Sequence, residues 1–304
     1  MLQTIEQSRG RANGIQAYDL VSYAVDIGKV QVTYLYCNMI LHTFKWLIYP
    51  SPHVEPEKLK KHFTGKRIVV TGASKGIGRA LVHSLIEAQA NIVLIARDEK
   101  ELSELCSVAR MKGCEADYYA VDLRDREALF TLCSELHDRY SEVDYFFCNA
   151  GKSICRLIED AQDRLHDFDR TMGVNYRSLV ALSLAILPSL VKSKGRIIYT
   201  SSVSTLYPAV GGWSAYHSSK VAANMWCRTA SKEFKSKGVK VQIAYMPLVH
   251  TAMADVNPSY KNLPGYNASE AATLLLRLAM NDKSCYMPWW ARVSWRIAGI
   301  FGKA

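Results

Sequence analysis

The 304-residue chain lacks the sequence patterns that mark several common classes of protein. Its eight cysteines form no C-x-x-C pair and sit mostly within apolar runs, which predicts reduced, buried thiols and no disulfide framework. It has no HExxH motif and no paired Cys/His spacing, so we expect no metal. It also has no Lys/Arg block and no nucleic-acid-binding signature, so we expect no nucleic-acid partner despite the net charge of +10. The positive charge leaves an anionic membrane surface or an anionic ligand as candidate partners.

Residues 1–62 form an N-terminal extension, rich in apolar and aromatic residues, that ends in a charged linker. The apolar run starts too late for a signal peptide and lacks a small-residue cleavage site. Residues 32–49 approach the length of a spanning helix, about 20 residues, but Asn38, His42 and Lys45 would be costly at a bilayer centre. Two interpretations stay open: a cytoplasmic protein associated with a membrane through residues 32–49, or a helix buried against the domain or a second subunit.

Residues 63–280 alternate between short β-branched runs and helical patterns. RIVVTG, NIVLIAR, ADYYAVDL, VDYFFCNAG, GRIIYTSS and VQIAYMP are typical of buried strands, with apolar residues at helical spacing between them. This alternation predicts an α/β fold, a Rossmann-like doubly wound parallel sheet in a single domain.

Residues 281–304 form an amphipathic C-terminal tail that is compatible with a short helix. Trp290 and Val293 fall on one side of this helix, and Arg292 and Arg296 fall on another. The tail is either a second membrane contact or a helix that caps the domain.

The first predicted strand leads directly into the glycine-rich stretch TGASKGIG. Gly72, Gly76 and Gly78 lie between a strand and a helix, where the backbone can approach a pyrophosphate and the helix N-terminus faces its charge. Because this turn opens an alternating α/β domain, it predicts a dinucleotide site.

The charges beside the second strand favour NADP over NAD. A site for NAD places an acidic residue at the end of this strand, where this chain has Ala96 and Arg97. Arg97 can grip a 2′-phosphate with its planar guanidinium, and Lys75 in the glycine turn adds a second cation. Asp98, one residue further along, opposes this inference. The predicted cofactor is NADP(H).

Further motifs follow in order: VDL at Asp122, NAG from Asn149, MGVN ending at Asn175, YTSSVS, YHSSK and PLVHT. With them, residues 64–280 resemble the classical short-chain dehydrogenase/reductase family. The resemblance implies that Asp122 contacts the adenine and that Thr251 holds the nicotinamide amide. It also makes a homo-oligomer the expected state. The implied cofactor-binding residues are Gly72, Ser74, Lys75, Gly76, Ile77, Gly78, Arg97, Asp122, Leu123, Asn149, Ala150, Gly151, Tyr216, Lys220, Pro247, Val249 and Thr251.

The resemblance also implies a catalytic set of Asn175, Ser202, Tyr216 and Lys220. Tyr216 and Lys220 are four residues apart on a predicted helix and can therefore meet. We expect the ammonium to lower the pKa of the phenol, which would donate a proton to a carbonyl oxygen while a Ser hydroxyl polarises it. Asn175 would anchor a relay water. Ser201 remains an alternative to Ser202, because the interval from Ser202 to Tyr216 is one residue longer than the family suggests, an excess that the glycine pair in AVGGWS can absorb.

Two longer runs, NAGKSICRLIEDAQDRLHDFDRTMGVNY and YMPLVHTAM, resemble bacterial fatty acyl-CoA reductases of the short-chain type. This resemblance implies NADPH-dependent reduction of a lipid carbonyl, with long-chain acyl-CoA to fatty aldehyde as the first expectation. A 3-keto lipid, ketosphingoid base, retinoid or steroid is an alternative substrate, and a non-catalytic NADP-binding scaffold is an alternative of another class.

Three features beside the predicted substrate site carry expectations of their own. Lys152 and Arg156 either attract the phosphates of coenzyme A or are solvated surface charges. The apolar and aromatic residues between Thr251 and Asn267, which include Tyr260 and Tyr266, suggest a mobile lid. Asn267 and Glu270 have the spacing of a helix capping box.

Overall fold

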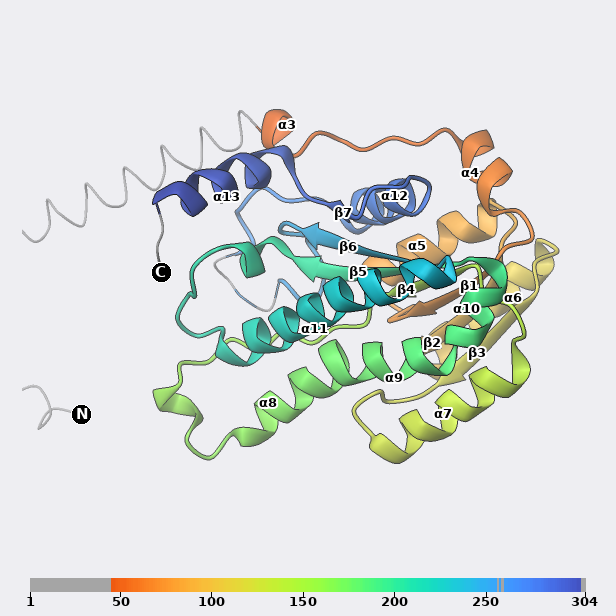
Figure 1. Ribbon diagram of the computed structural model, residues 1–304, viewed down its shortest axis with the longest axis horizontal. Helices are drawn as coiled ribbons and strands as arrows, with labels where there is room; N and C mark the ends of the chain where they lie inside the picture. Colours follow the sequence, from red (N-terminus) through yellow and green to blue (C-terminus); the bar gives the residue numbers. More distant parts are fainter. Residues whose placement is uncertain (1–44, 256, 258–259, 302–304) are drawn as a thin grey trace, which may run out of the picture.

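The computed structural model describes residues 45–255, 257 and 260–301, and its centre is a parallel sheet of seven strands (Figure 1). The strand order is β3-β2-β1-β4-β5-β6-β7, which confirms the predicted doubly wound α/β fold. The strands are β1 (Arg67–Thr71), β2 (Asn91–Ala96), β3 (Ala116–Ala120), β4 (Tyr145–Cys148), β5 (Arg196–Ser202), β6 (Lys240–Met246) and β7 (Cys285–Tyr286).

Helices cover both faces of the sheet, with a separate apolar core on each face (Figure 1). The first face carries α4 (Pro56–Phe63), α5 (Gly76–Glu87), α6 (Glu99–Met111) and α12 (Ala268–Ala279). The second carries α7 (Arg126–Arg139), α8 (Leu165–Met172), α9 (Ser178–Ala185), α10 (Leu187–Ser193) and α11 (Ser214–Glu233). The short helix α3 (Lys45–Ile48) and the final helix α13 (Trp289–Phe301) lie at one end. Shorter turns occupy Glu159–Ala161, Gly173–Arg177, Val203–Leu206 and Lys235–Lys237.

The central strands are continuous apolar runs because both of their faces are covered. Every residue of β4 is buried, and neighbouring residues contribute to opposite cores: Phe146 to one and Phe147 to the other. The same alternation places Val69 and Val70 of β1 on opposite faces. This covered sheet holds the strand ends, where the candidate site lies, in fixed positions.

The segment expected to be a linker before residue 63 is instead packed on the domain. Helix α4 crosses that boundary, begins at Pro56 and buries Phe63 completely, with the Phe63 ring 5.2 Å from the Tyr145 ring. Tyr49 meets Tyr266 edge to face at a ring separation of 5.1 Å. The linker interpretation was wrong for residues 56–63. The helix has only two apolar residues besides Pro56, Leu59 and Phe63, among five charged or polar ones, so its inward face is hard to recognise in the sequence.

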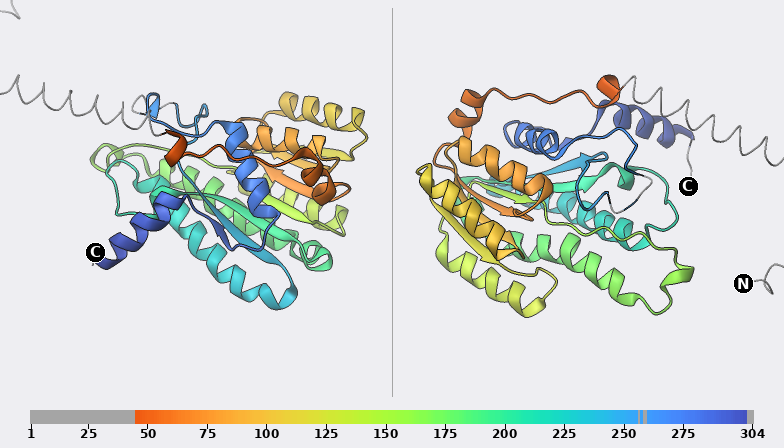
Figure 2. Two further views of the ribbon diagram at one scale, coloured as in Figure 1. Left: turned by 90° about the horizontal axis from the view of Figure 1, so that it is seen from above. Right: turned by 180° about the vertical axis from the view of Figure 1, so that it is seen from behind.

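The expected end of the domain at residue 280 also falls too early, because β7 pairs with β6 beyond it. A strand of two residues has no readable period in the sequence. The connection before β7 is held by the buried side chain of Gln242, whose amide donates to the carbonyls of Leu278, Asn281 and Lys283. The tail then forms α13, the helix that the sequence predicts, seen from two further sides in Figure 2.

Most of the run at 32–49 lies outside the described residues, so its predicted membrane association stays a prediction. Across the described ranges, no single helix is both long and apolar enough to cross a membrane. One bent pair, Leu165–Ala185 with Leu187–Ser193 at 59°, meets the length and composition requirements together.

Candidate active site

A cavity of about 630 Å³ opens along the carboxyl ends of the strands, where order reverses between β1 and β4. Ligands of open α/β sheets bind at such a switch point. Every predicted cofactor residue lines this cavity except Gly78, and so do Ser202, Tyr216 and Lys220 of the predicted catalytic set. Asn175 stands outside the lining.

The glycine turn leaves no room for side chains, as a pyrophosphate site requires. Gly72 has a φ of +69°, and a Cβ there would come within 3.0 Å of the Ala150 Cα. A Cβ on Gly78 would lie 2.1 Å from the Gly72 carbonyl oxygen, so this glycine allows α5 to pack closely on the end of β1. Gly78 lies outside the cavity lining, and its predicted contact with the cofactor stays a prediction.

The hydroxyl of Thr71, at the end of β1, joins the glycine turn to the NAG motif. It accepts hydrogen bonds from the backbone N–H groups of Asn149 and Ala150, each at 3.1 Å. Thr71 itself is fully buried. The motif therefore continues the wall of the cavity that the glycine turn begins.

At the end of the cavity beside β2 and β3, the charges are paired with one another. The ammonium of Lys75 lies 2.9 Å from the carboxylate of Asp98, and this hydrogen bond lowers the pKa of Asp98. The guanidinium of Arg124 donates both Nε and Nη2 to Asp122 and lowers its pKa. Arg97 lines the cavity with an exposed side chain.

Sequence reasoning missed Arg124, which lines the cavity and holds the predicted adenine-contacting acid. The one feature of the sequence that could have identified Arg124 is its position two residues after Asp122, at the end of a strand. Lys75 was expected to act as a second cation for a phosphate, but the structure gives it a carboxylate partner.

The hydroxyls of the adjacent residues Ser201 and Ser202 have different partners. The hydroxyl of Ser201 is buried and donates to Asn224 at 2.6 Å. The hydroxyl of Ser202 lies 2.9 Å from that of Ser204, and its interaction with Tyr216 lowers the pKa of that phenol. Gly212, in the glycine pair before Tyr216, has a φ of +82°, and whether this turn absorbs the additional residue stays a prediction. Both serines line the cavity, but the Ser201 hydroxyl is bonded to Asn224, whereas the Ser202 hydroxyl lies beside Ser204 and acts on Tyr216.

Tyr216 and Lys220 both belong to α11 and both line the cavity, as their spacing predicts. The ammonium of Lys220 donates to the Thr200 carbonyl at 2.8 Å and lies 4.9 Å from the centre of the Tyr199 ring. Burial lowers the pKa of Lys220 to about 8. Burial also raises the pKa of Tyr216 to about 12, against the hydrogen bond with Ser202, which lowers it. The expected lowering of the Tyr216 pKa was therefore wrong for this structure, because desolvation of the phenolate dominates.

Asn175 lies in a π-helical turn (Gly173–Arg177) between α8 and α9, and π-helical turns are frequent at functional sites. Its amide accepts from the backbone N–H of Lys152 at 2.8 Å and donates to the carbonyl of Lys152 and the hydroxyl of Ser219. A Cβ on Gly151 would be 3.4 Å from the Asn175 oxygen and 3.6 Å from the Lys220 nitrogen. The chain after β4 thus runs directly between Asn175 and Lys220.

The remaining wall of the cavity is apolar and aromatic. Trp213 stacks on Tyr260 at 5.9 Å with an angle of 10° and meets Tyr216 edge-on. The other apolar residues of this wall are Val203, Val210, Leu248, Met253 and Leu263. Of the predicted lid, Tyr260 and Leu263 line the cavity, but Tyr266 is buried in the core, so it is no part of a lid.

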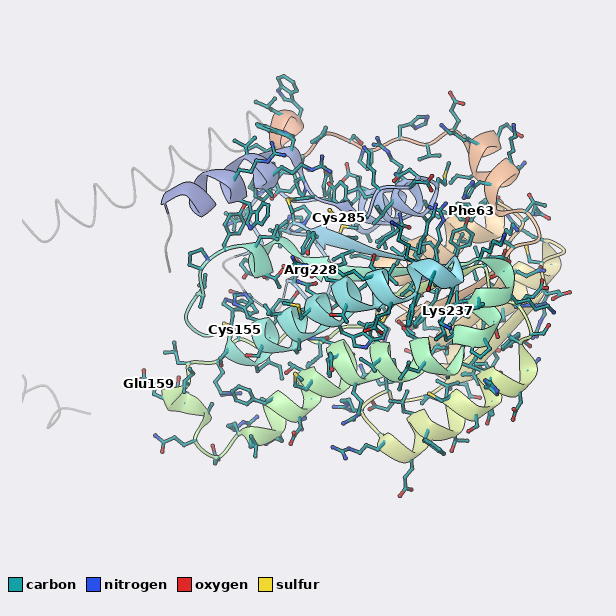
Figure 3. All side chains as sticks on the ribbon, in the orientation of Figure 1. Phe63, Cys155, Glu159, Arg228, Lys237 and Cys285 are labelled. Carbon is teal, nitrogen blue, oxygen red and sulfur yellow. The ribbon has the colours of Figure 1, made fainter. Side chains whose placement is uncertain are left out.

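The connection between β4 and α8, which carries the labelled Cys155 and Glu159, lies beside the start of α11 (Figure 3). Arg156 in this connection bonds the buried carboxylate of Asp167 at 3.0 Å, so the expectation of a freely solvated or phosphate-seeking cation does not fit it. Lys152 is exposed and lines the cavity. Beyond the site, Asn267 and Glu270 form the predicted capping box.

In the part of the chain that the structure describes, no group of three or more His, Cys, Asp or Glu side chains is placed to hold a metal ion. The absence of a metal stays a prediction for the whole chain.

Comparison with known proteins identifies the family. The model for short chain dehydrogenases matches residues 66–262. A fatty acyl-CoA reductase of Acinetobacter baylyi is 36% identical over 71% of this chain and 74% of its own length. Another, from Mycobacterium tuberculosis, is 33% identical over 77% of this chain and 78% of its own. A metagenomic short-chain oxidoreductase solved in complex with NADP superimposes with a TM-score of 0.62 at 24% identity, over 74% of this chain and 96% of its own.

The chain belongs to the short-chain dehydrogenase family, close to fatty acyl-CoA reductases. It is an oxidoreductase that uses NAD(P)(H).

Proposed function

We propose that this protein is an NADPH-dependent reductase that converts a long-chain fatty acyl-CoA to the fatty aldehyde. The observation that carries the proposal is the pairing of Ser202 with Tyr216 in the cavity wall, one helical turn from the buried ammonium of Lys220. The names of the two relatives from Acinetobacter baylyi and Mycobacterium tuberculosis support the substrate class.

The residues around the cavity fit a nicotinamide dinucleotide. The turn at Gly72 and Gly76 has positive φ at both residues and leaves space only for backbone, and the N-terminus of α5 follows it. When bound, the nicotinamide would supply the hydride. Arg97 would contact the 2′-phosphate of NADPH, because its exposed guanidinium lies at the end of β2 where an acid would select NAD.

Tyr216 would give the proton that the carbonyl oxygen needs. Its pKa of about 12 keeps the phenol protonated at neutral pH, and Ser202 would hold the same carbonyl oxygen through its hydroxyl. Lys220 would favour the phenolate that remains after the transfer. Asn175 would support this step through its bonds to the backbone of Lys152, which hold the chain between it and Lys220. Overall, the acyl-CoA takes up a hydride and a proton and releases the aldehyde and the thiol of coenzyme A.

The apolar wall beyond Tyr216 suits the chain of a fatty acyl group. Trp213, Leu248 and Met253 offer apolar surface, while Ser202 and Tyr216 are the few convergent polar groups that orient a carbonyl. Lys152 at the cavity edge would meet the phosphates of coenzyme A as a point charge.

Incubation with NADPH and palmitoyl-CoA, followed by identification of products by mass, tests this function. We expect hexadecanal from the wild type and from Tyr118→Phe, a control on β3 outside the cavity lining, and none from Tyr216→Phe. A parallel series with 3-keto lipids tests the substrate class. Reduction of the ketones alone would exclude the acyl-CoA substrate, and equal residual rates in wild type and Tyr216→Phe for every substrate would mark a non-catalytic scaffold.

A further inference from the structure

The two ends of the described chain are joined on one surface. The indole N–H of Trp289 donates to the carbonyl of Leu47 at 2.8 Å, and that of Trp290 donates to Ile48 at 3.1 Å. Helices α3 and α13 lie side by side in every view (Figures 1 and 2). Two carbonyls at the end of α3 and both indole N–H groups thus have hydrogen-bond partners within the protein.

The outer side of this junction exposes large apolar side chains. We call this surface the α3–α13 patch: Trp46, Leu47, Trp289, Val293 and Trp295, whose exposed fractions are 69%, 45%, 49%, 51% and 50%. The opposite side of α13 faces the domain, with Ala291 fully buried and Ser294 bonded to Tyr207 at 2.6 Å. An exposed group of this kind on a folded protein marks an interaction surface.

The charged residues of α3 and α13 all have one sign. Lys45, Arg292 and Arg296 stand beside the apolar residues, and the sequence has no Asp or Glu at residues 27–54 or 283–304. Tryptophan mixed with exposed cations is typical of a membrane interface, where rings lie at the headgroup level and cations meet lipid phosphates. The core of a subunit interface is instead depleted of charged residues, which argues against a second copy as the occupant.

The preceding chain also leads to this surface. Forty-four residues precede Lys45, and the apolar run at residues 32–49 ends within the patch. We infer that the α3–α13 patch lies against a membrane surface that contains anionic lipid, and that both ends of the described chain contribute to this contact.

A hydrogen bond connects helix α13 of the patch to a loop in the wall of the cavity. Tyr207, which bonds Ser294 of α13, begins a loop whose residues Val210 and Trp213 line the cavity. Val210 is itself 60% exposed and apolar. If the proposed lipid substrate is correct, this loop is the entry from the bilayer; the membrane contact itself does not depend on that substrate.

Flotation of the full chain with lipid vesicles tests the inference. The vesicles are phosphatidylcholine alone, or phosphatidylcholine with 30 mol% phosphatidylglycerol, a composition chosen for the assay and of roughly the anionic content that attracts basic segments. Arg292→Gln with Arg296→Gln should weaken binding to the anionic vesicles about 30-fold, since each cation near such a surface contributes about fivefold. Val293→Ser with Trp295→Ser should weaken binding to both vesicles.

Met111→Ser with Phe130→Ser is the matched control, because these exposed apolar residues lie on α6 and α7, outside the patch. It should float as the wild type does. NADPH fluorescence and thermal unfolding verify that each variant is folded, and neither depends on acyl-CoA reduction. Wild-type flotation of both patch variants, or no vesicle binding by the full chain, would overturn the inference. So would a dimer that dissociates in Val293→Ser with Trp295→Ser while vesicle binding is unchanged, because the patch would then be a subunit interface.

Discussion

The two ends of the cavity hold their polar groups in opposite ways. Beside α11, Lys220 is buried and bonded to the Thr200 carbonyl, and Asn175 is buried and bonded to the backbone of Lys152. Beside β2, the ammonium of Lys75 and the carboxylate of Asp98 are more than one-third exposed and bond each other. Buried groups with backbone partners have one stable arrangement, whereas exposed ion pairs are weak and exchange partners readily. The first end therefore holds its polar groups in one arrangement, whereas the ion pair at the second end can rearrange when a ligand binds.

Of the changes at the end beside α11, Tyr216→Phe should cause the largest loss of activity. Removal of the phenolic proton donor should lower turnover by about 10²- to 10⁴-fold, the usual contribution of a positioned general acid. NADPH binding, measured by fluorescence, should stay near the wild-type value because the ring is kept. A loss of NADPH binding equal to the loss of turnover would show that Tyr216 acts in binding and not as the acid.

Ser202→Ala and Ser201→Ala form a matched pair at adjacent positions. Ser202→Ala should lower turnover by about 10²- to 10³-fold, as loss of one donor to a reacting oxygen does. Ser201→Ala removes a buried bond to Asn224, so its main effect should be on the free energy of unfolding, by about 1 kcal/mol. Steady-state kinetics and urea unfolding of both variants separate these effects. A larger turnover loss for Ser201→Ala would reverse the assignment.

Lys220→Met should have opposite effects on activity and stability. Burial lowers the pKa of Lys220 from 10.5 to about 8, so below pH 8 the folded protein carries a buried charge that destabilises it. The variant should therefore be inactive but more stable at pH 7, by roughly 2 kcal/mol.

The unfolded chain binds more protons than the folded one between pH 8 and 10.5, so wild-type stability should rise with pH relative to the variant in that window. Urea unfolding at pH 7 and pH 9.5 measures the difference. A difference that does not shrink at pH 9.5 would contradict the lowered pKa.

Changes at the second end should have the smallest effects. Arg97→Ala should weaken NADPH binding about tenfold through loss of a charge-assisted bond to phosphate, with little effect on NADH. Asp98→Asn should strengthen NADPH binding by about threefold, since it releases Lys75 from an exposed pair. Arg126→Ala, an exposed residue outside the cavity lining, is the control for charge alone. Equal losses of NADPH and NADH affinity in Arg97→Ala would remove the phosphate assignment.

The contrast between buried groups beside α11 and exposed ion pairs beside β2 also explains what could be predicted from the sequence. The parallel sheet follows from buried strand patterns. Tyr216 and Lys220 both line the cavity because their spacing places them on one side of α11. The partners of Lys75 and Asp122 could not be predicted, because exposed side chains of several residues compete for each carboxylate. The direction of the Tyr216 pKa shift depends on burial, which a motif does not report.

Two local elements escaped prediction for other reasons. Helix α4 packs on the domain through Leu59, His62 and Phe63, and its remaining residues are mostly charged, as those of a linker are. Strand β7 has two residues and exists because β6 offers an edge. Both depend on tertiary packing more than on local pattern.

Transfer of a labelled hydride tests the proposed function most directly. The protein is incubated with palmitoyl-CoA and NADPH that carries deuterium at the transferred position, and the products are identified by mass. We predict hexadecanal, or the alcohol that follows it, containing deuterium from the cofactor, in wild type and not in Tyr216→Phe. No labelled aldehyde or alcohol from any acyl-CoA, with labelled alcohol formed from a 3-keto lipid, would contradict the acyl-CoA substrate.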